Sequence, residues 1–243
     1  RALTTPTNNP KPSYNMAATA ESFFTSDAAL ASNDAAKAAF AKYSKAASDA
    51  VIEKTKAALE KKNHAVTVVA DKAAALAALI DLIPEGVTIH NTSSTTLNQI
   101  GFVEHMKTST KWDNLHAKVL AEKDQAKAAD LRRQAQAAQY AISSVDAVTE
   151  DGDFAVADAS GTRIAVVHAA GKVVFVIGAN KLVPTIADAE DRIRNYCFQI
   201  ESARVRAAYG WPSSNVSNLL VVHTHGLMPA KFHFIIVKES LGF

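Results

Sequence analysis

A lysine and an asparagine follow the most apolar run of this sequence. Asn180 and Lys181 come directly after "KVVFVIG" and shortly before a proline. A lysine at the end of a strand can hold a carboxylate or a phosphate or, when it is removed from water, lose its proton and act as a base or nucleophile. The simpler alternative is a solvated lysine beside an asparagine that caps a turn. Lys181 is therefore a candidate catalytic residue and Asn180 a candidate ligand-binding residue.

A hydroxyl-rich turn lies earlier in the chain, in the stretch "HNTSSTTLNQIG". Here Ser93, Ser94 and Thr95 connect an expected strand to an expected helix. Free backbone N–H groups and hydroxyls converge in such turns and can bind an anion. Alternatively, Ser94 or Thr95 serves only as a helix N-cap. His90, at the end of the strand, is a further candidate for a polar contact with a ligand.

Two carboxylates lie beside turns in "VTEDGDFAVADASGTR". Glu150 precedes Asp151-Gly152, and Asp158 precedes a Ser-Gly-Thr turn that opens a helix. Carboxylates in such places can act as general bases or bind a cation. A β-hairpin with an "EDG" turn would explain Asp151-Gly152 without any chemistry. Glu150 is nevertheless kept as a candidate acid or base, because the turn does not require it.

Three histidines near the end of the chain are weak candidates for metal ligands. His223 and His225 would lie on one face of a strand, with His233 on the next strand. Imidazoles bind zinc and copper, but this spacing fits no metal motif. We therefore expect no metal site.

The elements that must position these residues are strands alternating with helices. The pattern predicts an α/β fold of Rossmann-like, three-layer type, with a mostly parallel covered sheet and antiparallel edge strands. We expect a flexible arm at residues 1–15, a helical extension in two or three pieces at 16–63, and the α/β domain at 64–243. The stretch "NLHAKVLA" is expected to be a strand. The runs "NLLVVHTH" and "KFHFIIVK" could pair as an antiparallel edge hairpin.

Composition excludes several classes of function. The net charge is +2 with no basic stripe, which argues against nucleic-acid binding. Cys197 is the only cysteine, so the chain cannot form a disulfide or ligate an iron–sulfur cluster by itself. No G-x-G-x-x-G, P-loop or G-x-S-x-G motif occurs. The charged residues of the long helix near residues 185–209, including Arg192 and Arg204, are interpreted as a solvent-facing surface with intrahelical ion pairs.

No apolar run is long enough for a membrane span. Because the sequence begins with Arg, the native N-terminus is expected to be missing. We expect a cytoplasmic location, with secretion or organelle import left open.

The order of these stretches resembles the LUD (lactate utilisation) domain family. The resemblance is carried by "LIPEGVTIHNTSSTTLNQIGF", "AVTEDGDFAVADASGTRIA", "VVFVIGANKLVPTIADAEDRIR" and "FHFIIVKESLGF", which cover about residues 50 to 243. It implies a fold similar to ribose-phosphate isomerase and the coenzyme A transferases. The pocket it implies contains Ser93, Ser94, Thr95, Glu150, Asp158, Gly161, Thr162, Arg163, Asn180 and Lys181.

Two departures from the family pattern affect what the resemblance implies. The chain reads "SGTR" where the family usually has "TGNR", so Thr162 replaces an asparagine. It also lacks the cysteine cluster of many stand-alone members, so no iron–sulfur cluster is expected, and the cofactor is otherwise unknown. Family members are associated with lactate oxidation alongside iron–sulfur partner proteins, and for this chain that role is inherited only by name.

Three functions fit the sequence. The first is binding of a small anionic metabolite, such as a carboxylate, a phosphate or an acyl-CoA compound, as an accessory to lactate utilisation or as an enzyme in its own right. The second is a non-catalytic protein that self-associates, for example as a homodimer, or docks through its N-terminal helices. The third, ranked last, is a metal-dependent hydrolase or nuclease that uses Glu150, Asp158 and the histidines.

Overall fold

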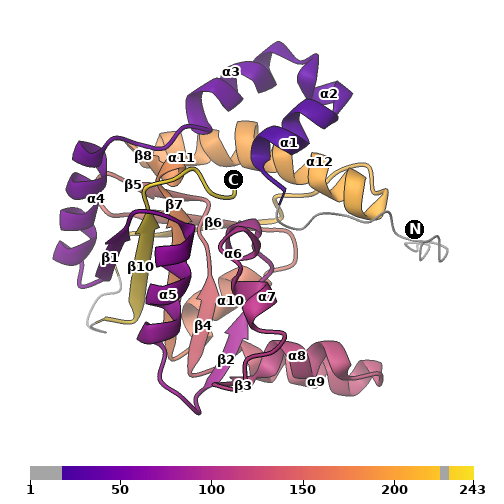
Figure 1. The fold of residues 1–243 in the computed structure, drawn as a ribbon. Helices are drawn as coiled ribbons and strands as arrows, with labels where there is room; N and C mark the ends of the chain where they lie inside the picture. Colours follow the sequence, from indigo (N-terminus) through magenta and orange to yellow (C-terminus); the bar gives the residue numbers. More distant parts are fainter. Residues whose placement is uncertain (1–17, 225–229) are drawn as a thin grey trace.

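A parallel sheet of six strands forms the centre of the molecule in the computed structural model, which describes residues 18–224 and 230–243 (Figure 1). The flexible arm predicted for residues 1–15 lies outside this part. All neighbouring strands of the sheet run parallel, in the order β1-β10-β7-β4-β2-β3. Its strands are β1 (Ala65–Val69), β2 (Thr88–Asn91), β3 (Asp113–Asn114), β4 (Tyr140–Ser143), β7 (Lys172–Gly178) and β10 (Phe232–Val237).

A second sheet of four strands packs beside the first, in the order β8-β5-β6-β9. Its β5–β6 and β6–β9 pairs are antiparallel, and its β5–β8 pair is parallel. Its strands are β5 (Ala147–Thr149), β6 (Phe154–Asp158), β8 (Leu182–Val183) and β9 (Asn218–Val222). The strand signal "YAISSVDAVT" is therefore divided between the two sheets, since β4 belongs to the first and β5 to the second.

The helices precede, connect and cover the strands of both sheets. They are α1 (Ala20–Ser26), α2 (Ala28–Ala31), α3 (Asp34–Tyr43), α4 (Asp49–Lys61), α5 (Lys72–Leu82), α6 (Thr95–Gln99), α7 (Phe102–His105), α8 (Leu115–Ala121), α9 (Gln125–Gln136), α10 (Thr162–Ala169), α11 (Ile186–Arg192) and α12 (Phe198–Tyr209). A 3₁₀ turn, η1 (Ala179–Lys181), follows β7, and a π-helical turn, η2 (Ile193–Cys197), joins α11 to α12. The expected two or three N-terminal helices are thus four.

After its exposed first residue, Lys172, strand β7 is apolar because both faces of the parallel sheet are covered. Val173 and Phe175 point into a core that contains residues of α4, α10 and the second sheet. Val174 and Val176 point to the opposite face, where α5, α6 and α7 pack. A third core lies between the second sheet, the α11–α12 segment and the N-terminal helices. Figure 1 shows α1, α2 and α3 lying over α11 and α12, while α4 lies beside β1.

The α/β fold class with a mostly parallel, covered sheet is confirmed, but two local predictions were wrong. "NLHAKVLA" is not a strand: the Asn114 side chain accepts a hydrogen bond from the backbone N–H of Ala117, and helix α8 begins at Leu115. The terminal runs do not form a hairpin either. Strand β10 lies between β1 and β7 in the parallel sheet, whereas β9 pairs antiparallel with β6 at the edge of the second sheet.

Candidate functional site

The carboxyl ends of β2, β4 and β7 meet at one edge of the main sheet, and a cavity of about 260 Å³ lies there. Ligands of open α/β sheets bind at such edges. Seven of the predicted site residues line this cavity, from three separate stretches of the sequence. They are Ser93, Ser94, Thr95, Asp158, Thr162, Arg163 and Lys181.

Lys181 lies at the end of η1 and is only 2% exposed, so it is not the solvated lysine of the simpler interpretation. Its Nζ donates hydrogen bonds of 3.0 Å to the Ser144 hydroxyl and 3.0 Å to the Val145 carbonyl. Burial, and to a lesser extent the nearby Arg192 guanidinium, lower the Lys181 pKa to about 7, although the Asp146 carboxylate acts in the opposite direction. The amine therefore exchanges its proton near neutral pH.

Arg163, which is partly buried, and Asp146, which is buried, form an ion pair next to this lysine. The Arg163 guanidinium lies 3.2 Å from the Asp146 carboxylate and also donates to the carbonyls of Ala157 and Ser144. The second carboxylate of the cavity, Asp158, accepts the backbone N–H groups of Ser160 and Arg163, at 2.9 and 2.5 Å. Both carboxylates are thus held by donors of the protein itself.

Arg192 lies behind the cavity and is completely buried, so its prediction as a solvent-facing residue was wrong. Its guanidinium donates to the backbone carbonyls of Asp146 and Asn180 and to the Cys197 sulfur. One nitrogen, Nη2, has no hydrogen-bond partner among the described residues. Arg192 ends α11 just before η2, and π-helical turns inside helices are frequent at functional sites.

Cys197 contributes an uncharged sulfur to the cavity wall. The thiol is buried, and burial raises its pKa to about 11. A thiol with a raised pKa is a poor nucleophile at neutral pH. Cys197 therefore supports Arg192 and is not a candidate for covalent chemistry.

Hydroxyl groups line much of the polar wall. Ser94 does cap α6, since its Oγ accepts from the backbone N–H of Leu97 at 3.3 Å, and it lines the cavity as well. Both interpretations of this residue are thus compatible. The neighbouring Thr96 is buried and also lines the cavity, and its hydroxyl has no partner among the described residues.

Apolar side chains and the last residues of the chain form the opposite wall. Ile193, Phe198 and Val216 line it, together with Phe243, whose ring packs edge-on against Phe23 of α1. The tail is fixed by two hydrogen bonds. The backbone N–H of Leu241 donates to Asn180 Oδ1 at 3.0 Å, and that of Gly242 donates to Gln99 Oε1 at 2.7 Å.

Arg204 and Glu201 of α12 also line the cavity. Two guanidinium nitrogens of Arg204 each lie 2.6 Å from a Glu201 oxygen, so the expected intrahelical pair does form. The other charged residues of this segment pair with the N-terminal helices or within α11. Lys42 of α3 contacts Asp188 and Asp191, Arg206 contacts Asp27, and Arg194 contacts Glu190.

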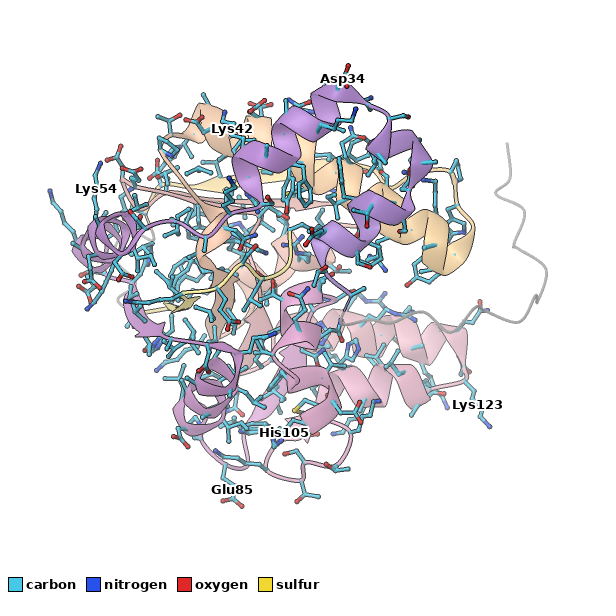
Figure 2. The ribbon with its side chains drawn as sticks, turned by 45° about the horizontal axis from the view of Figure 1, so that its top comes forward. Asp34, Lys42, Lys54, Glu85, His105 and Lys123 are labelled. Carbon is cyan, nitrogen blue, oxygen red and sulfur yellow. The ribbon has the colours of Figure 1, made fainter. Side chains whose placement is uncertain are left out.

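Four predicted site residues do not line the cavity. Glu150 lies at the β5–β6 turn and pairs with Lys54 of α4 at 2.7 Å, and Figure 2 shows Lys54 on the outside of the molecule. Asn180 is buried and connects η1 to the C-terminal tail. His90 is buried with its ring 5.6 Å from that of His116, and Gly161 precedes α10 with a φ of +85°.

Among the charged and polar residues of the site, Ser144, Asp146, Arg192, Glu201 and Arg204 were not predicted to be site residues from the sequence. Ser144 and Asp146 follow strand β4. Asn180 and Lys181 were chosen because they follow a strand, and the same criterion could have identified Ser144 and Asp146. The strand signal runs on through "SSVDAV" into β5, which concealed the end of β4. No local signal marks Arg192, because its helix carries charged residues on every face.

Metal ligands do not converge in the part of the chain that the structure describes. His223 lies beside Asp153, with Nδ1 2.9 Å from the carboxylate. His233 lies on β10 of the main sheet and contacts the hydroxyl of Thr67 on the neighbouring strand β1. His225 lies outside the described residues. The described ranges also contain no helix long and apolar enough to span a membrane.

Comparison with known proteins places the chain in a family. The model of the LUD domain matches residues 52–237. A solved structure of a DUF162 family protein from Deinococcus radiodurans is 12% identical, with a TM-score of 0.49, and the match covers 77% of this chain and 96% of that one. Ribose 5-phosphate isomerase from Plasmodium falciparum gives 16% identity and a TM-score of 0.29, over 46% and 52% of the two chains. The sequence matches no curated protein. The family model covers most of the chain, and the chain belongs to the LUD domain family.

Proposed function

We propose that the cavity binds a small organic anion, a carboxylate or a phosphate, in a role accessory to lactate utilisation or as an enzyme. The observation that carries this proposal is the environment of Lys181. Lys181 lines the cavity and is buried, and its amino group has only neutral hydrogen-bond partners among the described residues. A buried cation without a counter-ion is unfavourable, and an anionic ligand would supply the missing charge.

The charges around the lysine support this choice. Asp146 and Glu201 are already paired with arginines, and Asp158 is held by backbone N–H groups. Because Arg192 has no carboxylate partner among the described residues, it adds to the positive potential behind the cavity. A ligand anion would therefore be attracted, and it would raise the pKa of Lys181 so that binding takes up a proton.

The size and lining of the cavity indicate a small ligand with one polar and one apolar end. The cavity volume of about 260 Å³ lies just below the usual range for ligand pockets, about 300–1,000 Å³. The lining contains the hydroxyl-bearing Ser93 and Thr95 as well as the aromatic Phe198 and Phe243. Lactate, pyruvate and the head groups of sugar phosphates or acyl compounds have this character. Glu150 has no part in the proposal because it lies outside the cavity.

Thermal unfolding with a panel of ligands tests this function. The panel contains lactate, pyruvate, a sugar phosphate and an acyl-CoA compound. A ligand that binds only the folded state adds about 2.7 kcal/mol of stability at a free concentration of about one hundred times its Kd. We expect at least one panel member to stabilise the wild type and to have no effect on Lys181→Ala. The control is Lys172→Ala, which removes an exposed lysine at the other end of β7. No stabilisation by any panel member would contradict the proposal.

A further inference from the structure

We propose that Lys181 is a nucleophile that forms an imine with the carbonyl group of a small 2-oxo acid bound in the cavity. This rests on the proposed anion-binding function and names its substrate class. It adds a covalent step in which the Lys181 nitrogen forms a bond to the substrate in addition to attracting it by charge. The argument depends on three features of the site: the hydrogen bonds of Nζ, the charges around it, and the neighbouring hydroxyl.

The two hydrogen bonds of Lys181 leave one position of its nitrogen without a partner. Nζ donates to Ser144 and to the Val145 carbonyl, and these bonds account for both N–H groups of a neutral amine. The remaining position is then the lone pair. No other hydrogen bond or ion pair of Nζ is formed within residues 18–224 and 230–243, and the side chain lines the cavity. A neutral amine in a cavity wall is the form that attacks a carbonyl carbon.

The surroundings favour this neutral form. Lys181 is almost completely buried, and its cationic neighbours Arg192 and Arg163 oppose a third positive charge, while Asp146 is already paired with Arg163. A lysine that is desolvated or placed beside another cation is activated as a nucleophile in this way.

The reaction balances without any oxidant or reductant. The Lys181 nitrogen bonds to the carbonyl carbon, and the electron pair of the C=O bond moves to oxygen, which gains a proton. The resulting carbinolamine then loses its hydroxyl group as water, and a C=N bond forms. Ser144 accepts a hydrogen bond from Nζ and can also donate one through its own hydroxyl hydrogen, so it can pass a proton from nitrogen to oxygen.

The charges of the site also favour a substrate that has a carboxylate next to its carbonyl group. A protonated imine places one positive charge at the same buried position that an ammonium would occupy. In a 2-oxo acid the carboxylate is attached directly to the reacting carbon, so its negative charge lies beside the new nitrogen. The small cavity volume favours short members of this class. Lactate has the same carboxylate but no carbonyl group, so it can bind without reacting.

Reductive trapping of the full chain tests the imine. The protein is incubated with pyruvate or glyoxylate and sodium borohydride, and the modified residue is mapped by mass spectrometry. We expect one adduct per chain, on Lys181, formed at least tenfold faster than on Lys172. Excess lactate should protect Lys181 from modification. Because the site is mapped in the wild type, this result does not depend on a variant that folds.

Lactate and pyruvate bound to the wild type separate the imine from anion binding. Both carry a carboxylate but only pyruvate has a carbonyl group, so both should stabilise the protein and only pyruvate should give the Lys181 adduct on reduction. If lactate stabilises the wild type but labelling is spread evenly over surface lysines, the imine is excluded and the anion site remains. If neither stabilisation nor labelling of Lys181 occurs, both proposals fail.

Discussion

The amino group of Lys181 donates a 3.0 Å hydrogen bond to the hydroxyl of Ser144, which lies 37 residues earlier in the chain. The two residues follow neighbouring parallel strands, β7 and β4, so the sheet itself brings them together. With the Val145 carbonyl, Ser144 fixes the direction of the lysine nitrogen. The site thus depends on a contact that exists only when the main sheet is assembled.

Anion binding should depend on pH through Lys181. In the ligand-free protein the pKa of Lys181 is about 7, and a bound anion raises this pKa. Above pH 7, binding must therefore take up a proton. We expect the affinity to fall by up to about tenfold for each pH unit above 7 and to change little below it. Titration calorimetry in two buffers of different ionisation enthalpy measures both the affinity and the proton uptake. An affinity that is constant between pH 6 and 9 would contradict this linkage.

Removing Asp146 should destabilise the fold. Its carboxylate accepts the Ala157 N–H at 2.7 Å and neutralises Arg163 inside the protein. Asp146→Ala leaves the partly buried Arg163 guanidinium without its carboxylate partner, and we expect a loss of about 3 kcal/mol in the free energy of unfolding. The control Glu190→Ala removes the exposed partner of Arg194 and should cost less than about 0.5 kcal/mol. Urea unfolding measures the stability of both variants. Equal losses would show that the Asp146–Arg163 pair stabilises the fold no more than the exposed Glu190–Arg194 pair does.

Gly242 should tolerate no side chain. Its φ is +61°, and an added Cβ would collide with the Thr96 hydroxyl and lie 3.3 Å from Lys181 Nζ. Gly210→Ala is the matched control, since Gly210 has a φ of +69° and open space around it. We expect Gly210→Ala to cost about 1 kcal/mol from its backbone alone and Gly242→Ala roughly 2–3 kcal/mol. If the two losses were equal, the tail would not be packed tightly against the site.

The protein should lose stability in mild acid because of His90. Burial, together with a smaller effect of the nearby His116, lowers the His90 pKa to about 4. In the unfolded chain the group titrates near 6.5, so the unfolded state binds more protons between these values. The contribution of His90 to the free energy of unfolding is therefore complete above about pH 6.5, and it declines as the pH falls towards 4. Allowing for solvent screening, this loss is about 2 kcal/mol.

Unfolding free energies measured from pH 4 to 8 test this dependence. His90→Asn should flatten the curve between pH 6.5 and 4 relative to the wild type. The control His168→Asn changes an exposed histidine of α10 and should leave the curve unchanged. A wild-type curve with the same slope as His90→Asn would show that His90 does not contribute.

The sequence by itself determined most of the elements and, for β2 and β7, the points where the strands end. The apolar run of β7 specifies a strand covered on both faces, and the Ser/Thr turn specifies a helix start. Because parallel strands end at one edge, these local signals were sufficient to bring Ser93 and Lys181 to one cavity.

Only the tertiary structure decided which charged residues are buried and what they contact. Glu150 and Lys181 both follow strands, yet one pairs with Lys54 at the surface and the other is enclosed. Arg192 has the local sequence of a surface residue but becomes buried where α11 covers the second sheet. Likewise, β9 and β10 are neighbours in sequence but belong to different sheets. Local patterns report the conformation of a segment, whereas burial and pairing depend on groups that are distant in the chain.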